Sequence, residues 1–331
     1  MNETLTAITG VRVGHAHDAA GLTGCTVVLF ESRNRVSVSI AGGSPGTYNI
    51  GPLLNTWRGV SCDAIFLAGG SIYGLDAAAG VRQFVETVVL SERPKPATGP
   101  ASFLGGLVTG AVIFDLQVGS ATSRPDASMG YAAAANASTL PVIEGNVGVG
   151  CGATVGKFLG PTQAMKSGVG SVCFVAAAGF QVGALVVVNA LGNVFDVDQG
   201  QVLAGARTPG ADEITEFTTL LRQERSLPQT QGQHTTLGVI VTDVELDALL
   251  LSKMACAGQD GLARAVRPAH TALDGDTFFA VTTAQRPLPK ALPLSAPDAI
   301  IHLASEAVRV AILRAVKAAH SLGSLPGLAK E

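Results

Sequence analysis

Short apolar runs alternate with longer amphipathic stretches in the N-terminal part of the chain. The runs at 24–30, 36–43 and 63–70 are rich in valine and other apolar residues, and the last two end at pairs of glycines. Such runs predict β-strands. Residues 71–89 follow the third run directly and carry apolar side chains near helical spacing. We therefore expect a helix there.

The middle of the chain continues in the same way. The run at 111–116 predicts another strand. Pro125 followed by Asp126 marks the start of a helix, because both residue types favour the first turn. Two further apolar runs, at 172–178 and 182–190, predict a pair of strands.

The stretch between Lys166 and Asp196 contains no charged residue, which raises the question of a membrane span. It also contains Gln181, Asn189 and five glycines. These residues interrupt the continuous apolar run that a spanning helix requires. We therefore interpret the stretch as the two buried strands and expect no contact with a membrane.

The composition changes between 198 and 234. This segment is polar and rich in turn-forming residues, and we interpret it as an internal linker that holds one short helix at 212–225. The elements after it are expected as a strand at 235–244, a helix at 245–266, a strand at 277–283 and a helix at 298–320. Strands in series with interspersed helices favour a layered α/β protein.

The composition excludes several classes of protein. Of the 331 residues, 47% are hydrophobic and only 14% are charged, so the chain is not intrinsically disordered. The net charge of −3 gives no attraction for nucleic acid. With so few charges to cover a surface, part of that surface is expected to be hidden in a homo-oligomer, for example a tetramer.

No cofactor or metal is expected. The five cysteines are scattered, without the spacing of a disulfide framework or a zinc site. His15 and His17 form the closest histidine pair, and Asp274 and Asp276 flank a glycine in a pattern more typical of a turn. Neither pair has the further ligands of a metal site. The N-terminus lacks a basic stretch followed by an apolar one, so we expect a cytoplasmic protein without a signal peptide.

A glycine-rich segment at 145–157 has some likeness to a phosphate-binding loop. The P-loop pattern requires glycine at Cys151 and serine or threonine at Phe158, and the dinucleotide pattern requires glycine at Ala153. None of the three positions meets its requirement. We interpret the segment as tight turns and close backbone packing, with amides that could also hold an anion.

The junction at 233–236 joins the polar linker to the strand that begins at Thr235. A pair of threonines at the start of a strand is common. However, a threonine hydroxyl in such a place can also attack the carbonyl of the preceding residue, and hydrolysis of the resulting ester leaves the threonine as a new N-terminus. Its amine, with an ordinary pKa of about 7.7–8.0, then serves as a base near neutral pH. The spacing alone does not distinguish these two interpretations.

Blocks of residues spread along nearly the whole chain decide between these two interpretations, because they resemble the blocks of a known family. These blocks are GVRVGHAHD, TGCTVVLFE, AGGSPGT, LAGGSIYGLDAAAGV, AVIFDL, RPDASMGYAA, GNVGVGCGATVGK, AMKSGVGS, VVVNALGNVFD, HTTLGVIVTD and DGLARAVRPAHTALDGDTFFAVTT. With these blocks in this order, the chain resembles the DmpA-like family of self-processing aminopeptidases, which also includes the nylon-oligomer hydrolases.

The resemblance implies a four-layer αββα sandwich, the architecture shared with ornithine acetyltransferases, in one catalytic domain over residues 1–331. It also implies a precursor that is cut once, between His234 and Thr235, and that assembles as an oligomer. The products of the cut would be an α chain of residues 1–234 and a β chain of residues 235–331.

The resemblance also implies a role for each of five residues. Thr235 matches the nucleophile, and its freed amine matches the base. Asp274 and Asp276 match the acidic pair that orients this amine and hydroxyl. Asn189 matches the asparagine that helps to hold the oxyanion, and Lys157 matches a lysine near the same site. The roles are chemically reasonable, because carboxylates stabilise an ammonium, whereas an amide N–H and a cation stabilise an oxyanion.

Two positions depart from the family pattern. His234 stands where relatives have asparagine before the nucleophile. Because histidine titrates near pH 6.5, we expect slow, pH-dependent self-cleavage that His234→Asn accelerates. Phe114 stands where some hydrolase relatives have a tyrosine, and Tyr73 is the candidate to supply a phenol to the substrate pocket in its place.

The resemblance thus implies an amide-bond hydrolase that matures by self-cleavage. Expected substrates are short peptides with a free amino terminus or amino-acid amides, including those of D- or β-residues. Three alternatives are kept: hydrolysis of linear ω-amino-acid oligomers, acyl transfer to an amine instead of water, and a non-catalytic binding protein that stays uncleaved because of His234.

Overall fold

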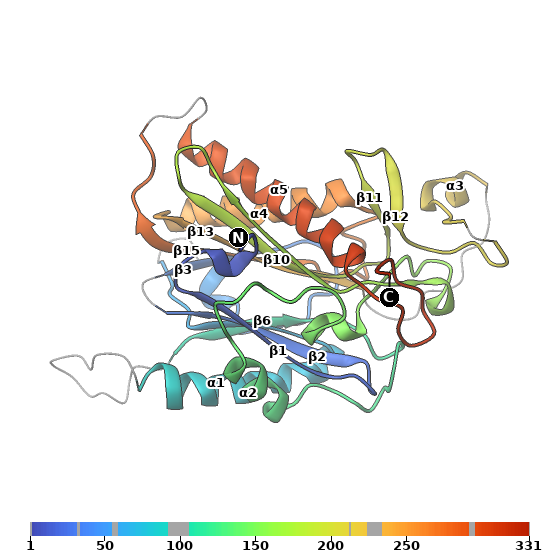
Figure 1. Cartoon of the computed structure of the whole chain (residues 1–331), viewed down its shortest axis with the longest axis horizontal. Helices are drawn as coiled ribbons and strands as arrows, with labels where there is room; N and C mark the ends of the chain where they lie inside the picture. Colours follow the sequence, from blue (N-terminus) through green and yellow to red (C-terminus); the bar gives the residue numbers. More distant parts are fainter. Residues whose placement is uncertain are drawn as a thin grey trace.

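Two five-stranded β-sheets pack face to face, and helices cover both outer faces (Figure 1). The computed structural model describes residues 2–31, 34–54, 59–91, 106–211, 213–223, 234–290 and 295–330. The layers follow one another as helix, sheet, sheet and helix. This arrangement confirms the four-layer αββα sandwich expected from the sequence.

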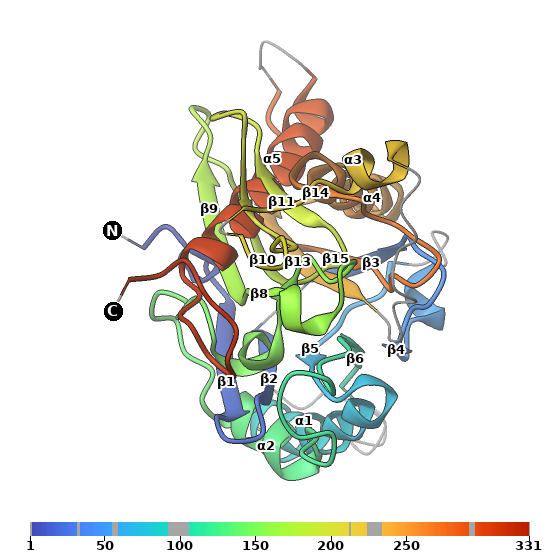
Figure 2. The same ribbon diagram turned by 90° about the vertical axis from the view of Figure 1, so that its right-hand side faces the viewer.

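The first sheet contains N-terminal strands in the order β1-β2-β5-β6-β4 (Figure 2). Its strands are β1 (Val11–Asp18), β2 (Thr23–Phe30), β4 (Thr47–Tyr48), β5 (Ala64–Ala68) and β6 (Val108–Val112). β5 and β6 are parallel, and the other neighbours are antiparallel. β2, β5 and β6 are buried along their whole length, because other layers cover both faces of the sheet.

The second sheet joins distant segments of the chain in the order β3-β15-β13-β10-β9. Its strands are β3 (Arg35–Ile40), β9 (Val169–Val175), β10 (Gln181–Asn189), β13 (Thr235–Val244) and β15 (Thr277–Arg286). β13 lies at the centre, antiparallel to β10 and parallel to β15. The strand that begins at Thr235 is therefore held between a strand from before this residue and a strand from after it.

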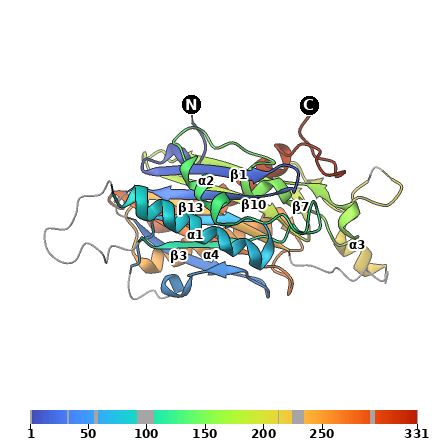
Figure 3. The same ribbon diagram turned by 90° about the horizontal axis from the view of Figure 1, so that it is seen from below.

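The outer layers are helical. Helices α1 (Ala77–Phe84) and α2 (Ala127–Ala135) cover the first sheet (Figure 3), and α4 (Ala248–Ala265) and α5 (Ala296–Lys317) cover the second. Side chains cap three of them: Asp126 accepts a hydrogen bond from the amide of Met129, Asp247 from that of Leu250, and Ser295 from that of Asp298. Each cap satisfies an amide that has no partner within its helix.

A hydrophobic core fills each of the three boundaries between layers. Representative side chains are Phe66 and Val81 between α1 and the first sheet, Leu185 and Leu237 between the sheets, and Phe278 and Ile312 between the second sheet and α5. Successive residues of β13 alternate between two of these cores, so that Val239 faces the first sheet and Ile240 faces the helices.

Glycine allows α1 and α2 to cross in close contact. A Cβ atom on Gly80 of α1 would lie 1.7 Å from the carbonyl oxygen of Ala127. One on Gly130 of α2 would lie 2.1 Å from the carbonyl oxygen of Ala77. Both distances are far shorter than van der Waals contact. At this crossing, two of the many glycines in the sequence therefore allow the two helix backbones to pack directly against each other.

The segment between β10 and β13 adds a smaller layer at one end of the sandwich. It contains β11 (Asn193–Asp196), β12 (Gln201–Ala204) and α3 (Phe217–Arg222), and β11 also pairs with β14 (Val266–Arg267). β12 lies within the predicted linker, and α3 is shorter than the predicted helix at 212–225. Residues 212 and 224–233 lie outside the described part of the chain.

The remaining elements are short. They are β7 (Thr154–Val155), β8 (Met165–Lys166), and the helical turns η1 (Leu5–Ala7), η2 (Gly51–Leu54), η3 (Ser71–Asp76), η4 (Val85–Val89), η6 (Gly148–Gly152) and η7 (Pro161–Gln163). Together η3, α1 and η4 fill the helix predicted at 71–89. The strand predicted at 111–116 lies a few residues earlier in the chain, because β6 begins at Val108 and ends at Val112. β1 was missed, because GVRVGHAHD contains no continuous apolar run.

The charge-free stretch between Lys166 and Asp196 forms β9 and β10, as expected. Within the described ranges, no helix is both long and apolar enough to cross a membrane. The two strands are instead covered by the first sheet on one face and by the helices on the other.

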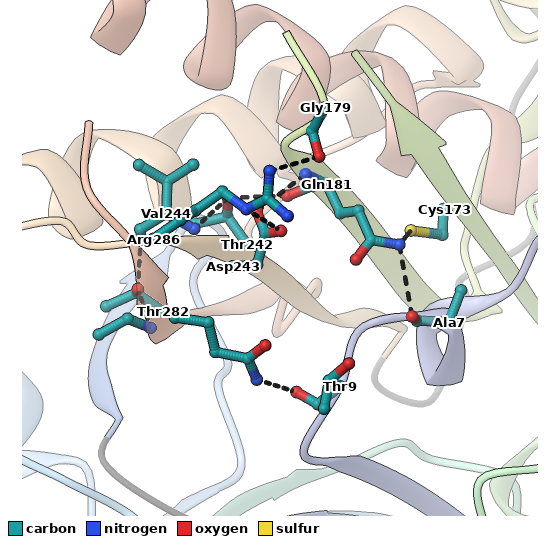
Figure 4. Close-up of polar contacts among 12 residues, drawn as sticks. Ala7, Thr9, Cys173, Gly179, Gln181, Thr242, Asp243, Val244, Thr282 and Arg286 are labelled. Carbon is teal, nitrogen blue, oxygen red and sulfur yellow. Dashed lines mark hydrogen bonds and ion pairs between the residues drawn. The ribbon is translucent and has the colours of Figure 1, made fainter. Parts of the chain in front are cut away.

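A network of polar contacts fixes the C-terminal end of β13 (Figure 4). Arg286 of β15 forms an ion pair with Asp243, with Nε and Oδ2 at 2.8 Å, and donates a hydrogen bond to the carbonyl oxygen of Gly179. The other carboxylate oxygen of Asp243 accepts a hydrogen bond from the amide of Gln181. Strands β10, β13 and β15 are therefore tied together at the end opposite Thr235.

Candidate active site

Thr235 is the first residue of β13 and pairs with Asn189, the last residue of β10. Directly paired residues of antiparallel strands project to the same face of a sheet. Leu237, which shares this face by alternation, belongs to the core between the two sheets. Thr235 and Asn189 therefore lie together at one end of this core, and Thr235 is only 2% exposed.

The peptide bond between His234 and Thr235 is held against the loop that precedes β15. The amide of His234 donates a hydrogen bond to the carbonyl oxygen of Leu273 at 3.0 Å. The carbonyl oxygen of His234 accepts a hydrogen bond from the amide of Gly275 at 2.8 Å. In the acyl shift expected from the sequence, this is the carbonyl that the Thr235 hydroxyl would attack. An oxyanion formed there already faces a main-chain N–H donor.

The carboxylate of Asp276 lies beside the start of β13. Its Oδ1 atom accepts a hydrogen bond from the amide of Thr236 at 2.8 Å, and its Oδ2 atom accepts one from the amide of His270 at 3.1 Å. Asp276 is almost completely buried. Its charge is therefore one residue away from the amine that a cut before Thr235 creates.

The carboxylate of Asp274 is held by its own turn. Its Oδ2 atom accepts a hydrogen bond from the amide of Thr271 at 2.6 Å. Burial, together with the neighbouring carboxylate of Asp276, raises the pKa of Asp274 to about 6, against the opposing charge of Lys157. Such a group changes its protonation state close to neutral pH, as suits a residue that accepts a proton during a reaction.

Gly275, between the two acids, leaves no room for a side chain. A Cβ atom on it would lie 2.8 Å from Oγ1 of Thr235 and 2.7 Å from the carbonyl oxygen of Ser44. The Thr235 hydroxyl therefore lies directly against this glycine. The Asp-Gly-Asp pattern does form a turn, and the turn also brings two carboxylates to the start of β13.

Asn189 and Lys157 form a hydrogen-bonded pair next to Thr235. Nζ of Lys157 donates to the side-chain oxygen of Asn189 at 2.6 Å and to its main-chain oxygen at 3.0 Å. The side-chain oxygen also accepts from the amide of Thr154, and Nδ2 donates to the carbonyl oxygen of Phe114 at 2.9 Å. The amide of Asn189 is therefore fixed, and the second N–H bond of Nδ2 is the one that could serve an oxyanion.

The ammonium group of Lys157 is buried at this position. Burial lowers the pKa of Lys157 to about 7, while the carboxylates of Asp274 and Asp115 oppose the shift. The charge of Lys157 therefore changes close to neutral pH. The site contains a carboxyl group and an amine that both titrate near neutral pH.

The side chain of His234 fills a pocket beside Lys157. His234 is 3% exposed, and neither ring nitrogen has a hydrogen-bond partner among the described residues. A cavity of about 20 Å³ remains beside the ring. Its walls are Phe114, Gln117, Val118, Thr154, Lys157, Pro161, His234 and Leu325.

This environment corrects the expectation that His234 titrates during self-cleavage. Burial and the neighbouring charge of Lys157 lower the pKa of His234 to about 3. The imidazole is therefore neutral at pH 5.5 and at pH 8 alike. Any pH dependence of self-cleavage in this range has to come from other groups, of which Asp274 and Lys157 are the nearest candidates.

Phe114 and Tyr73, the two residues considered for the substrate pocket, lie in different places. Phe114 lines the small cavity beside the His234 ring. Tyr73 is 50% exposed and stacks on Arg124, with the guanidinium carbon 3.7 Å from the ring centroid. It is not among the residues around the His234 pocket. The structure brings Phe114 to the site and leaves Tyr73 outside the pocket.

His270 also contacts the site, although it was not predicted from the sequence. Its Nδ1 atom lies 2.9 Å from Oδ2 of Asp276, and this hydrogen bond raises the pKa of His270. Its Nε2 atom lies 3.4 Å from the carbonyl oxygen of Gln259. His270 therefore orients the carboxylate of Asp276. Its place in the HTALDGD block is the signal that could have indicated it.

The remaining candidate residues take part in packing. Within the described residues, no group of three or more His, Cys, Asp or Glu side chains is arranged to hold a metal ion. Nδ1 of His15 lies 2.9 Å from Oγ1 of Thr26, and Nδ1 of His17 accepts a weak hydrogen bond from the amide of Gly148. Oγ1 of Thr26 also accepts a hydrogen bond from the amide of Val149, so both histidines support the glycine-rich segment. All five cysteines are free thiols.

The sequence has relatives among known proteins. The sequence profile of peptidase family S58 matches residues 3–328. An uncharacterized aminopeptidase of Mycobacterium leprae (strain TN) is 36% identical over 358 residues, which cover 98% of this chain and 92% of that protein. A 6-aminohexanoate-oligomer endohydrolase of Kocuria sp. (strain KY2) is 34% identical over 322 residues, which cover 93% of this chain and 84% of that protein.

The fold also has a counterpart among solved structures. The L-aminopeptidase D-Ala-esterase/amidase of Ochrobactrum anthropi superposes with a TM-score of 0.68 over 96% of this chain and 86% of that chain, at 19% sequence identity. It is described as a prototype of the serine aminopeptidases and as a variant of the Ntn-hydrolase fold. At this level of identity the likeness establishes the fold.

Proposed function

Because this chain belongs to peptidase family S58 and is therefore an amide-bond hydrolase, we propose that it cuts itself once, between His234 and Thr235, and then acts as an aminopeptidase with Thr235 as nucleophile. The proposed substrates are short peptides with a free amino terminus and amino-acid amides. The observation that carries the proposal is that the His234 carbonyl and the Thr235 hydroxyl both lie against Gly275.

In the proposed self-cleavage, Oγ1 of Thr235 attacks the carbonyl carbon of His234 and loses its proton to a base. The charge on the carbonyl oxygen is held by the N–H of Gly275. The C–N bond then breaks, the Thr235 nitrogen takes a proton, and an ester links His234 to Oγ1. Water hydrolyses this ester, which releases the carboxylate of His234 and the free amine of Thr235.

In the proposed turnover, the freed amine of Thr235 takes the proton from its own hydroxyl, and Oγ1 attacks the substrate carbonyl. The leaving amine receives the proton, and water hydrolyses the acyl ester. Asp274 and Asp276 stabilise the ammonium form of the Thr235 amine. Asn189 and Lys157 lie next to Thr235 and supply an N–H donor and a positive charge for the oxyanion.

We also propose that the α chain (1–234) and the β chain (235–331) stay together as one catalytic domain. The order of strands supports this, because β13 and β15 lie between β3 and β10 in the second sheet. The low charge content and exposed apolar side chains such as Leu140 and Ile143 support a homo-oligomer. Free thiols at all five cysteines support a cytoplasmic location.

Intact-mass measurement of the purified protein tests cleavage and its position together. The expected result is two chains with the masses of residues 1–234 and 235–331. A single full-length mass after prolonged incubation would contradict the proposal and favour a non-catalytic binding protein. Release of p-nitroaniline from L-leucine p-nitroanilide without an added amine acceptor then distinguishes hydrolysis from acyl transfer.

A second candidate function is hydrolysis of linear ω-amino-acid oligomers. The similarity to the 6-aminohexanoate-oligomer endohydrolase favours it. Incubation of the cleaved protein with a 6-aminohexanoate oligomer, followed by chromatography of the products, measures this activity directly. A higher kcat/KM on the oligomer than on amino-acid amides would make this the main function.

Asp274→Asn and Asp276→Asn are each expected to lower kcat/KM for amide hydrolysis by more than about tenfold, which corresponds to about 1.4 kcal/mol in the barrier. Each change removes a negative charge that stabilises the ammonium form of the Thr235 amine. Self-cleavage should respond less to Asp276→Asn, because the same nitrogen is then a neutral amide, whereas Asp274→Asn also removes the proposed proton acceptor and should slow self-cleavage as well. Steady-state kinetics of the two cleaved variants measure the effect. Turnover at the level of the unmodified protein would limit the two acids to a role in the turn.

The rate of self-cleavage is expected to depend on pH as a bell with its maximum between about pH 6 and pH 7. As the pH falls through about 6, Asp274 becomes protonated and no longer accepts a proton. As the pH rises through about 7, Lys157 loses the charge that favours an oxyanion. Precursor disappearance, followed on denaturing gels at pH 5.5, 6.5 and 8, measures the shape.

His234→Asn is the control for this pH dependence. Since the pKa of His234 is lowered to about 3, its replacement should leave the shape of the bell unchanged, even if the maximal rate rises. Asp274→Asn should instead remove the decline on the acid side. A bell that flattens in His234→Asn would assign the titration to His234 after all.

A further inference from the structure

The buried His234 side chain borders a small cavity, and the ring and the cavity together make up one pocket, although self-cleavage requires only the carbonyl group of this residue. We propose that the pocket, once His234 has left it, receives the side chain of the substrate residue whose carbonyl is attacked, and that it selects neutral L side chains of about the size of an imidazole ring. This inference rests on the proposed function and adds the acyl-side specificity to it.

Self-cleavage and turnover pass through the same kind of ester. In self-cleavage the acyl group on Oγ1 of Thr235 is the His234 residue, and in turnover it is the N-terminal residue of the substrate. The oxygen atom and the carbonyl carbon it binds are equivalent in the two esters. The side chain of the acyl residue therefore starts from the same position in both reactions. In both, it projects into the pocket of His234.

The main chain around His234 is held as a substrate residue would be. Its N–H donates to Leu273 and its carbonyl accepts from Gly275, so both polar groups are paired. A substrate residue offers an ammonium and a carbonyl at these two positions. His234 and Asp274 are bridge partners, so the substrate ammonium would lie beside the main chain of the turn that carries Asp274 and would take the place of the N–H that donates to Leu273. The same contacts that hold the precursor thus suit a free amino terminus.

The pocket is closely matched in size to His234. The cavity that remains beside the ring, about 20 Å³, is enough for roughly one water molecule. A leucine side chain, which is similar in volume to histidine, fits the same space. An indole ring is much larger than an imidazole ring, and a tightly packed interior resists added volume. We therefore expect the pocket to exclude a tryptophan side chain.

The pocket selects against positive charge. None of its walls is a carboxylate, and Lys157 is the one charged side chain that lines it. Whether Lys157 is charged or neutral, a lysine side chain, or the terminal ammonium of a 6-aminohexanoyl group, would lose its hydration there with no carboxylate of the lining to pair with. A neutral imidazole is accepted, but its nitrogens find no hydrogen-bond partners among the described residues. The pocket therefore has no preference for histidine over an apolar side chain of equal size.

The first test compares kcat/KM of the cleaved protein on p-nitroanilides at about pH 7.5. The L-histidine and L-leucine substrates are expected to exceed the L-lysine, L-tryptophan, D-leucine and 6-aminohexanoyl substrates by at least tenfold. Equal or higher values for L-lysine or the 6-aminohexanoyl substrate would overturn the inference, while leaving amide hydrolysis by Thr235 intact. No hydrolysis of any substrate would reject the proposed function and the inference with it.

The second test uses residue 234 itself as the probe. His234→Leu is expected to cleave itself at a rate within about threefold of the unmodified chain, whereas His234→Lys and His234→Trp should be at least tenfold slower. The order of these rates should match the order of the p-nitroanilides, since one pocket receives both groups. Two unrelated orders would show that the substrate side chain lies elsewhere.

A variant in the pocket wall gives the third test. Leu325 lines the pocket, whereas Leu322, on the same C-terminal segment, does not. In fully cleaved protein, Leu325→Phe is expected to lower the ratio of kcat/KM for L-leucine to that for L-alanine p-nitroanilide by at least tenfold. The matched variant Leu322→Phe should leave this ratio unchanged. An unchanged ratio in Leu325→Phe would overturn the inference.

Discussion

Replacing Thr235 with alanine is expected to leave a single uncut chain that hydrolyses no amide. The hydroxyl of Thr235 supplies the oxygen that attacks in both reactions, and without the cut its amine is never freed to act as the base. We expect a loss of at least about 10³-fold in kcat/KM. Intact mass and p-nitroanilide hydrolysis measure the two effects, and circular dichroism checks that the chain has folded.

Thr236→Ala is the matched control, because it removes the neighbouring hydroxyl. By alternation Thr236 faces the helices and not the core between the sheets, and its hydroxyl has no hydrogen-bond partner among the described residues. This variant should cleave itself and turn over substrate. Two chains of normal mass from Thr235→Ala would show that a different residue is the nucleophile.

Gly275→Ala is expected to have the second-largest effect, although it removes no reacting group. The added Cβ atom would lie 2.8 Å from Oγ1 of Thr235 and 2.7 Å from the carbonyl oxygen of Ser44. The hydroxyl or the strand therefore has to move, and a displacement of about 1 Å from the attacking geometry costs roughly 10²-fold in rate. A time course of precursor disappearance measures the slower self-cleavage.

Gly51→Ala provides the comparison for this substitution. A Cβ atom on Gly51 would meet no other atom within 4 Å. The same chemical change there should leave both self-cleavage and turnover unchanged. If Gly275→Ala also cleaves at the original rate, the hydroxyl of Thr235 does not lie against Gly275 at the moment of attack.

Much of the fold could be predicted from local patterns. The strand at 235–244 has the expected bounds, because its apolar and β-branched residues form one continuous run between polar segments. Helix α4 begins at the cap Asp247 and shows helical periodicity throughout. β1 and β12 escaped prediction for the opposite reason. Their residues are of mixed polarity, and their pairing with neighbouring strands decides their structure.

The contacts of the site could not be predicted in this way. Lys157, Asn189, Thr235 and Asp274 come from four separate segments, and only strand order brings them together. The resemblance named these residues, but it contained neither the hydrogen bond from Gly275 to the His234 carbonyl nor the burial of the His234 ring. A histidine in sequence has an ordinary pKa, and only its surroundings in the fold reveal that it stays neutral.

The position of β13 in the second sheet has a consequence for reversibility. The uncut chain folds in a unimolecular process, in which β13 and β15 insert between strands to which they are covalently linked. After the proposed cut, refolding would require two separate polypeptides to meet, so its yield would depend on protein concentration. The mature protein would then be lost on unfolding at dilutions from which its precursor recovers, and its lifetime would be set by the rate of unfolding and not by an equilibrium.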